Sequence, residues 1–197
     1  ITLQQFSRGH VNNDATWMSA FQSVVDDYVK NVKRVIQNPH SQIVNYRTSR
    51  KAEQIKHWTP AMEELYGEVE KEGKLEEFYF SYDESCSTHD TMENRFVKHT
   101  LHSIGRKLVV IISTVLSATQ EELSEKHRKV WIGYSDTIKK LSKHPFFKTI
   151  SRFDGLKQES LVLQSRNGYQ QIYKDWLKLK RGIDLYNGAA NIGTLQI

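Results

Sequence analysis

The chain has 197 residues, of which 38% are hydrophobic and 26% charged, and its formal net charge at pH 7 is +5. With only three prolines, this composition excludes a disordered chain and a loop-rich β-sandwich, and it favours helix. The four Trp, nine Tyr and eight Phe supply enough apolar material for one sizeable core or two small ones.

The cysteine content and the hydropathy indicate the cellular location to expect. Cys86 is the single cysteine, so an intrachain disulfide and a cysteine-based zinc site are both excluded. The longest apolar stretch, residues 108–116, is about half as long as a membrane span. We therefore expect a soluble, cytoplasmic protein with no membrane partner. The start at Ile1 and the stop at Ile197 read as those of a segment of a larger protein.

The first predicted element is a helix of about six turns. Asn13 or Asp14 provides its N-cap, and Asn38-Pro39 ends it. Between them, apolar residues recur every three or four positions, as on the buried face of a helix. They are Trp17, Phe21, Val24, Val25, Tyr28, Val32, Val35 and Ile36.

In residues 41–83 the apolar residues no longer recur every three or four positions. Alternating side chains predict short strands over residues 42–46 and 75–83, which are compatible with a two-stranded ribbon. Between them, Thr59 and Pro60 open a short helix that Gly73 ends.

From Asp90 onward, apolar residues again recur at helical spacing, and they do so over a long stretch. This spacing predicts one helix over about 27 residues, a link at Ala118-Thr119, and a second helix over residues 120–144 that Pro145 ends. We expect the two helices to form an antiparallel hairpin. A last helix starts near Asn167-Gly168 and stops at Gly182.

The predicted fold is therefore mainly α: a helical bundle with a long antiparallel helical hairpin and room for a small β-ribbon. Residues 1–87 hold the first helix and a basic and acidic connecting region. Residues 88–197 hold the helical domain, and we expect the two parts to pack as one compact unit. Trp131, Trp176 and Tyr169 are expected in the core.

The charges are unevenly distributed. Residues 29–58 carry seven Lys or Arg against a single acid, and residues 60–84 carry nine Asp or Glu against two Lys. Arg47, Arg50, Lys51 and Lys56, interleaved with Tyr46 and Trp58, are candidates for binding a nucleic-acid backbone and stacking on a base. Alternatively, these basic residues pair with the acidic run at residues 63–84.

A second candidate group lies at the start of the long hairpin. Arg95 and Lys98 are candidates for holding phosphates. The structural alternative is that Glu93, Asn94 and Arg95 cap or pack the helix. The spacing of Cys86, His89 and Glu93 is not specific enough to indicate a metal site, and neither is the spacing of His99 and His102. No phosphate-binding glycine loop and no local nucleophile motif is present, so we assign no catalytic, cofactor or metal residue.

Two stretches resemble a known family. Residues 88–99, THDTMENRFVKH, and residues 161–173, LVLQSRNGYQQIY, resemble motifs of an uncharacterised domain in McrC-like subunits of McrBC-type restriction systems. Residues 47–60 more loosely resemble a basic segment that precedes the first motif.

In that family the domain precedes a PD-(D/E)XK nuclease, which requires Mg²⁺, and the subunit works with an AAA+ motor. This chain ends before such a nuclease would begin. The resemblance implies a non-catalytic coupling module that contacts DNA or RNA and an AAA+ NTPase. Alternatives are a purely structural or oligomerising helical domain, and an enzyme with an unrecognised site.

Overall fold

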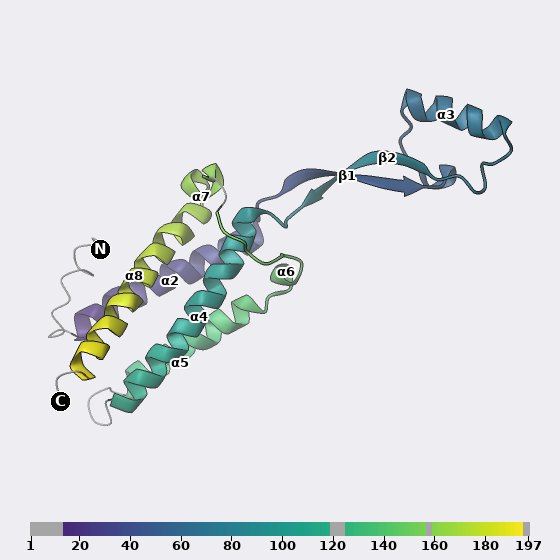
Figure 1. The fold of residues 1–197 in the computed structure, drawn as a ribbon. Coiled ribbons are helices and arrows are strands. Elements are labelled where there is room, and N and C mark those ends of the chain that lie inside the picture. The colour runs from purple at the N-terminus through teal and green to yellow at the C-terminus, as the bar shows by residue number, and fades with distance from the viewer. Residues whose placement is uncertain (1–13, 119–124, 157–158, 195–197) are drawn as a thin grey trace. The chain divides into compact units, whose positions relative to one another are not determined.

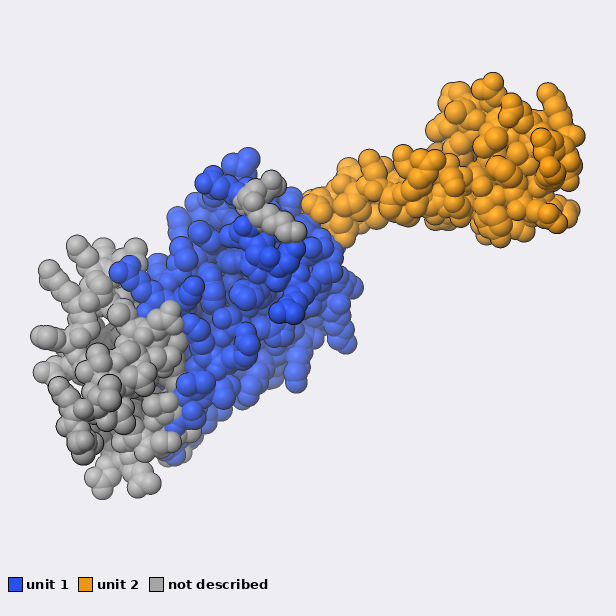
Figure 2. Space-filling view, viewed as in Figure 1, with its two compact units in different colours: residues 1–40, 89–197 blue, residues 41–88 orange. Residues whose placement is uncertain are grey.

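The computed structural model describes residues 14–118, 125–156 and 159–194. The chain is mainly helical with one two-stranded antiparallel sheet, as the sequence predicts (Figure 1). It divides into two units (Figure 2). Residues 1–40 and 89–197 form the first, here called the helical unit, and residues 41–88 form the second, the ribbon unit.

The helical unit is built on four long helices, α2 (Asp14–Gln37), α4 (Met92–Ala118), α5 (Glu125–Ser142) and α8 (Tyr169–Thr194). Helix α2 contacts α5 and α8, and α4 contacts the same two helices, so the four close into a bundle. Helices α4 and α5 run in opposite directions, which confirms the predicted hairpin (Figure 1). The predicted link at Thr119 and the start of the second helix lie outside the described residues.

The bundle core is formed by the apolar faces that the sequence periodicity predicts. Phe21 and Tyr28 of α2 are fully buried, and the Phe21 ring stacks on Trp131 of α5 at 5.0 Å between centroids. The Tyr28 hydroxyl lies 2.7 Å from the hydroxyl of Thr100, so its polar end is satisfied inside the core. Trp131 and Tyr169 are buried as expected, whereas Trp176 is half-buried at the margin of the core.

Three details of the helices differ from prediction. Pro145 follows the end of α5 and also opens a short helix that was not predicted, α6 (Pro145–Lys148), capped by the His144 ring. A second short helix, α7 (Leu161–Ser165), was not predicted, and Ser160 caps it. Helix α8 continues through Gly182 to Thr194, because one glycine costs only about 1 kcal/mol in a helix.

The ribbon unit consists of β1 (Gln42–Arg50) and β2 (Phe80–Thr88), paired antiparallel from Gln42 with Thr88 to Arg50 with Phe80. The predicted ribbon is confirmed, but β1 is longer than expected and β2 begins at residue 80 rather than 75. The reason is that Leu75 and Phe78 pack into a hydrophobic cluster instead of pairing with a strand.

That cluster forms the core of the head, residues 51–79, which joins the two strands. Ile55, Met62 and Phe80 are its buried centre. The head contains the 3-10 turn η1 (Ala52–Gln54) and helix α3 (Pro60–Lys71), whose first turn is capped by Thr59. Gly73 follows α3 with a φ of 69° and ends it, as predicted.

The expected division at residues 87 and 88 differs from the observed units. The first helix belongs with the C-terminal helices, because its apolar face packs on α5 and α8. The ribbon unit is thus an insertion between α2 and α4. Among the described residues, no helix is both long and apolar enough to cross a membrane.

The turn before α8 gives a first prediction. Gly168 has a φ of 90°, and a Cβ atom there would lie 3.2 Å from Cγ2 of Val35. We expect Gly168→Ala to lower the free energy of unfolding by roughly 1–3 kcal/mol through backbone strain and crowding. Urea unfolding measures the change.

Gly133→Ala in α5 is the matched control, since a Cβ atom there meets nothing within 4 Å. It should leave stability unchanged or raise it by up to about 1 kcal/mol. Equal effects of the two substitutions would contradict the assigned role of Gly168.

Candidate functional site

The residues of both family-like motifs meet in one polar network within the helical unit. Its centre is the fully buried side chain of Asn94. Nδ2 of Asn94 donates to the carbonyl oxygens of His40, at 2.8 Å, and His89, at 2.7 Å. Oδ1 accepts from the hydroxyl of Tyr169 at 2.5 Å. One amide therefore holds together the end of the α2 segment, the start of α4 and the start of α8.

Tyr169 connects the second motif to the same point. Its hydroxyl also accepts the backbone N–H of His40 at 2.6 Å, and burial raises the pKa of Tyr169 to about 12. The Arg166 guanidinium lies over the Tyr169 ring at 5.6 Å and 2.9 Å from Nδ1 of His40. The phenol is thus fixed as a neutral hydrogen-bonding group at neutral pH.

A second part of the network is ionic. Arg95 donates through Nε and Nη2 to the two carboxylate oxygens of Asp90, each at 2.8 Å. Asp90 also accepts the backbone N–H and the hydroxyl of Ser151, at 2.8 and 2.6 Å. The Arg95 guanidinium and these bonds from Ser151 hold the pKa of Asp90 well below its ordinary value.

The remaining acid of the first motif is also engaged. Glu93 is buried and accepts the hydroxyl of Ser160 at 2.6 Å, while Nε2 of His40 lies 4.0 Å away. Burial raises the pKa of Glu93, but the hydrogen bonds from Ser160 and Thr91 and the charge of His40 leave it below the ordinary value. Ser160 in turn caps α7 by accepting the N–H of Leu163.

These contacts locate two predicted binding residues, Arg95 and Lys98. Arg95 is half-buried and paired with Asp90, and Nζ of Lys98 donates to the carbonyl oxygen of Ile150 at 2.5 Å. The geometry matches the structural alternative, in which the first motif packs and fixes the start of the helix. Phosphate binding by these two side chains stays a prediction.

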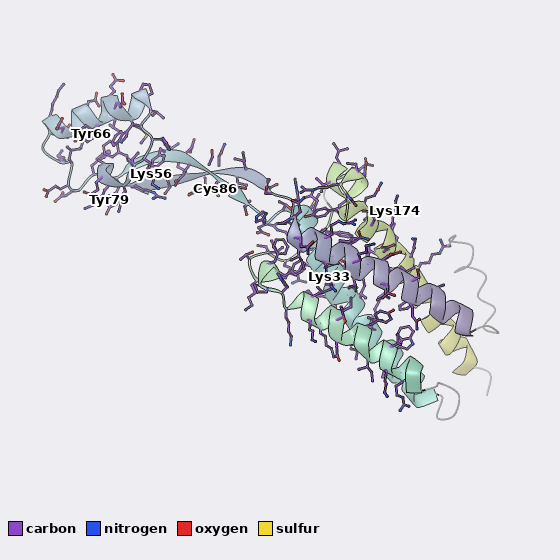
Figure 3. All side chains as sticks on the ribbon, turned by 180° about the vertical axis from the view of Figure 1, so that it is seen from behind. Lys33, Lys56, Tyr66, Tyr79, Cys86 and Lys174 are labelled. Atoms are coloured by element: carbon purple, nitrogen blue, oxygen red, sulfur yellow. The ribbon has the colours of Figure 1, made fainter. Side chains whose placement is uncertain are left out.

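The other four predicted binding residues lie in the ribbon unit, and three of them line one hollow of about 860 Å³: Arg47, Arg50 and Lys56. Asp83 and Glu84 line it too, and Arg50 forms an ion pair of 2.9 Å with Glu84, whereas Arg47 and Asp83 are 3.9 Å apart. The pairing of basic residues with the acidic run, considered above as an alternative, is therefore present here. Figure 3 shows Lys56 in this unit.

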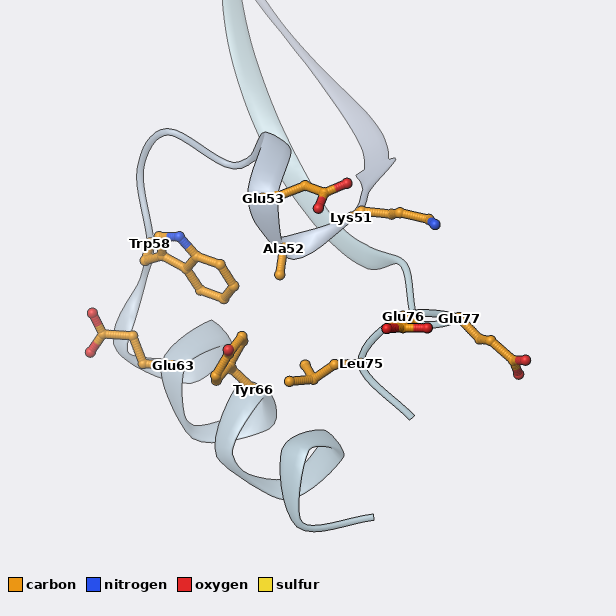
Figure 4. A pocket seen from close by; sticks show the side chains of 9 residues that line it. All are labelled: Lys51, Ala52, Glu53, Trp58, Glu63, Tyr66, Leu75, Glu76 and Glu77. Atoms are coloured by element: carbon orange, nitrogen blue, oxygen red, sulfur yellow. The ribbon is translucent and has the colours of Figure 1, made fainter. Parts of the chain in front are cut away.

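Trp58 and Lys51 lie at a different hollow of the head, with a volume of about 960 Å³ (Figure 4). Trp58 packs edge-on against Tyr66 at 5.4 Å and contacts Phe80. Four glutamates and one lysine line this hollow together with the aromatic rings: Glu53, Glu63, Glu76, Glu77 and Lys51. Such a charge balance disfavours a phosphate beside Trp58.

Lys98 lines a third hollow, on the helical unit, together with residues that the sequence did not single out for anion binding. Arg106 of α4 and Arg152 from the segment after α6 are among them. The four basic residues between positions 95 and 107, with no acid among them, were the only sequence signal. Arg152 is far away in sequence and carried none.

No metal site was predicted. In the described ranges, no three His, Cys, Asp or Glu side chains are grouped so that they could bind a metal ion. Cys86 is exposed on β2 in the ribbon unit, whereas His89 and Glu93 belong to the helical unit.

Fold and network define the class of the protein as a helical bundle that carries an inserted β-ribbon. The chain belongs to the family described as "Domain of unknown function (DUF2357)", which matches residues 2–176. Comparison with curated proteins and with solved structures gives no match.

The ionic part of the network predicts a pH-dependent effect of Asp90→Asn. We expect a loss of about 2 kcal/mol in the free energy of unfolding at neutral pH, since a bidentate charged pair is removed. The pKa of Asp90 is lowered in the folded state, so its contribution is complete above the unfolded value of about 4 and is lost as the pH falls below it. Urea unfolding over a pH series follows the difference between variant and wild type.

The control is Asp136→Asn, because Asp136 is exposed on α5 and has no ion pair in the described part of the chain. It should change stability by no more than about 0.5 kcal/mol. If the difference in the free energy of unfolding between Asp90→Asn and wild type did not become smaller at acidic pH, the role of the carboxylate charge would be contradicted.

The neutral part of the network predicts coupling between Asn94 and Tyr169. Tyr169→Phe leaves Asn94 Oδ1 and the His40 N–H without this partner, at a cost of about 1–3 kcal/mol. In a double-mutant cycle with Asn94→Ala, we expect a coupling free energy of about 1 kcal/mol or more. Tyr173→Phe on the same helix is the control, since the Tyr173 hydroxyl makes no hydrogen bond within the described residues. Additive effects of the Tyr169 and Asn94 substitutions would refute the coupling.

Proposed function

We propose that this chain is a non-catalytic coupling module of a McrC-like restriction or phage-defence subunit. In this proposal it positions an adjoining nuclease on nucleic acid and contacts an AAA+ motor partner. The module itself binds no cofactor, and any Mg²⁺ belongs to the nuclease. The two motifs at residues 88–99 and 161–173 support this placement, because both resemble those of McrC-like subunits.

The observation that carries the proposal is the use of the motif side chains. Asn94 and Tyr169 bond to each other, and Asp90 and Glu93 accept hydrogen bonds from Ser151 and Ser160. They fix His40 and His89, the two residues between which the ribbon unit is inserted. A framework that holds both ends of an insertion suits a module that transmits force or position, because neither end moves without breaking buried hydrogen bonds.

The charge distribution supports two kinds of contact. The helical unit carries 22 Lys or Arg against 13 Asp or Glu, and the ribbon unit carries 6 against 10. A basic bundle attracts a phosphate backbone, while an acidic ribbon unit attracts a basic protein surface. The proposal therefore assigns nucleic acid to the helical unit and the motor to the ribbon unit. Arg47 and Arg50 then serve the ribbon unit's own ion pairs, and Lys51 and Lys56 belong to its partner surface.

The second candidate function is a purely structural or oligomerising domain. It is favoured by the same internal network, which accounts for the motif residues without any ligand. The two candidates differ in salt-dependent binding of nucleic acid, since a purely structural domain is not expected to bind DNA or RNA.

We predict that the chain retains labelled DNA or RNA on a filter at about 50 mM salt. At about 200 mM salt, the affinity should be lower by a factor of about 10³ or more. Such loss follows from release of counterions when basic side chains contact several phosphates. Absence of binding at low salt would remove the nucleic-acid part of the proposal and favour the structural domain.

The nuclease context has a separate test in the coding sequence after Ile197. We expect predicted strands there that carry an Asp followed by Glu-x-Lys, the residues that hold Mg²⁺ in this class of nuclease. A continuation without them would withdraw the main support for placement in a McrC-like subunit.

A further inference from the structure

One hollow of the helical unit collects basic side chains from two separate segments. It has a volume of about 530 Å³ and is lined by Lys98, His99, His102, Arg106, Arg152 and Phe153. Lys98, His102 and Arg106 stand on α4 at intervals of four residues, which places them along one face of the helix, and His99 stands three residues before His102. Arg152 and Phe153 come from the segment that follows α6 and complete the lining.

Among the residues that the structure describes, no acidic side chain lines this hollow. In the described part of the chain, the side chains of His102, Arg106 and Arg152 make no hydrogen bond or ion pair, and all three are exposed. The two arginines thus differ from Arg95, whose fork is already occupied by Asp90.

The gathered charges repel one another. Burial lowers the pKa of His99, and the neighbouring Arg106 and His102 lower it further. The His99 ring is held in place by Phe153, at 5.2 Å between centroids, and by Trp176, at 6.1 Å. Lys98 is held through its bond to the carbonyl of Ile150. The hollow is therefore a prearranged set of donors whose mutual repulsion an anion would relieve.

We infer that this hollow is a binding site for the phosphates of a nucleic-acid strand, with Arg106 and Arg152 as its principal ligands. A guanidinium offers two parallel N–H groups to a phosphate, and here two guanidinium groups from separate segments line one hollow without a hydrogen bond or ion pair to any described residue. His102 lines the same hollow and adds a third donor. The inference deepens the proposed function and rests on it, because it locates the nucleic-acid contact within the helical unit.

The test is the salt-dependent affinity of the full chain for labelled single-stranded and duplex DNA and RNA, measured by fluorescence anisotropy. The variant Arg106→Gln/Arg152→Gln should bind at least about tenfold more weakly than wild type, with a salt slope shallower by about 2. Both side chains are exposed and form no hydrogen bond or ion pair with any residue that the structure describes, so the fold should persist, which circular dichroism checks.

The matched control is Arg128→Gln/Arg181→Gln, which removes the same charge from exposed positions on α5 and α8. It should alter the affinity by no more than about twofold. Equal weakening in both double variants would overturn the inference in favour of diffuse attraction. Full binding by the Arg106/Arg152 variant would also overturn it, yet leave the proposed function standing.

Competition with inorganic phosphate tests whether the site binds a nucleic-acid strand or a free phosphate ion. We expect phosphate at concentrations matched in phosphate groups to displace little oligonucleotide, because a strand engages several donors at once. Complete displacement under those conditions would show a site for small anions instead of a strand. Failure of wild type to bind any oligonucleotide at low salt would overturn both the inference and the nucleic-acid part of the proposed function.

Discussion

The side-chain amide of Asn94 makes three hydrogen bonds to three separate segments of the chain: His40, three residues after α2, His89, which precedes α4, and Tyr169 at the start of α8. It is fully buried, so each of its polar atoms must have a partner inside the protein. This requirement fixes the positions of His40 and His89 relative to each other, and those two residues bound the inserted ribbon unit. The order of the bundle at this end therefore depends on one amide and the phenol that bonds to it.

The ribbon itself is stabilised differently. Most of its side chains are exposed, so apolar burial contributes little along the strands. Polar cross-strand pairs define the register instead, for example Ser49 with Ser81 and Tyr46 with Glu84. At the far end, the buried ring of Phe80 joins β2 to the hydrophobic cluster of the head. A two-stranded ribbon alone is marginally stable, and here a small hydrophobic core in the head supports it.

Charge is used in two ways in this protein. Where an acid is at hand, as with Asp90 and Arg95 or Arg50 and Glu84, the basic side chain forms an ion pair within its own unit. At the hollow lined by Arg106 and Arg152, none of the described lining residues is an acid. Net charge over a stretch of sequence does not distinguish these cases, because an ion pair and an unpaired arginine count the same before the partner is known.

The sequence by itself determined the elements whose signals are local. Apolar spacing indicated α2 and the α4–α5 hairpin, Thr59-Pro60 and Gly73 indicated the limits of α3, and alternation indicated a ribbon. Only the tertiary structure decided which units these elements form and where β2 begins, because both depend on packing between distant segments. It also showed that α8 passes through Gly182, since one glycine is too weak a helix terminator to fix a helix end by itself. The same holds for the sites. Capping and packing by the Glu93-Asn94-Arg95 segment followed from its place at a helix start, whereas the meeting of Arg152 with α4 followed from a chain reversal that no local pattern records.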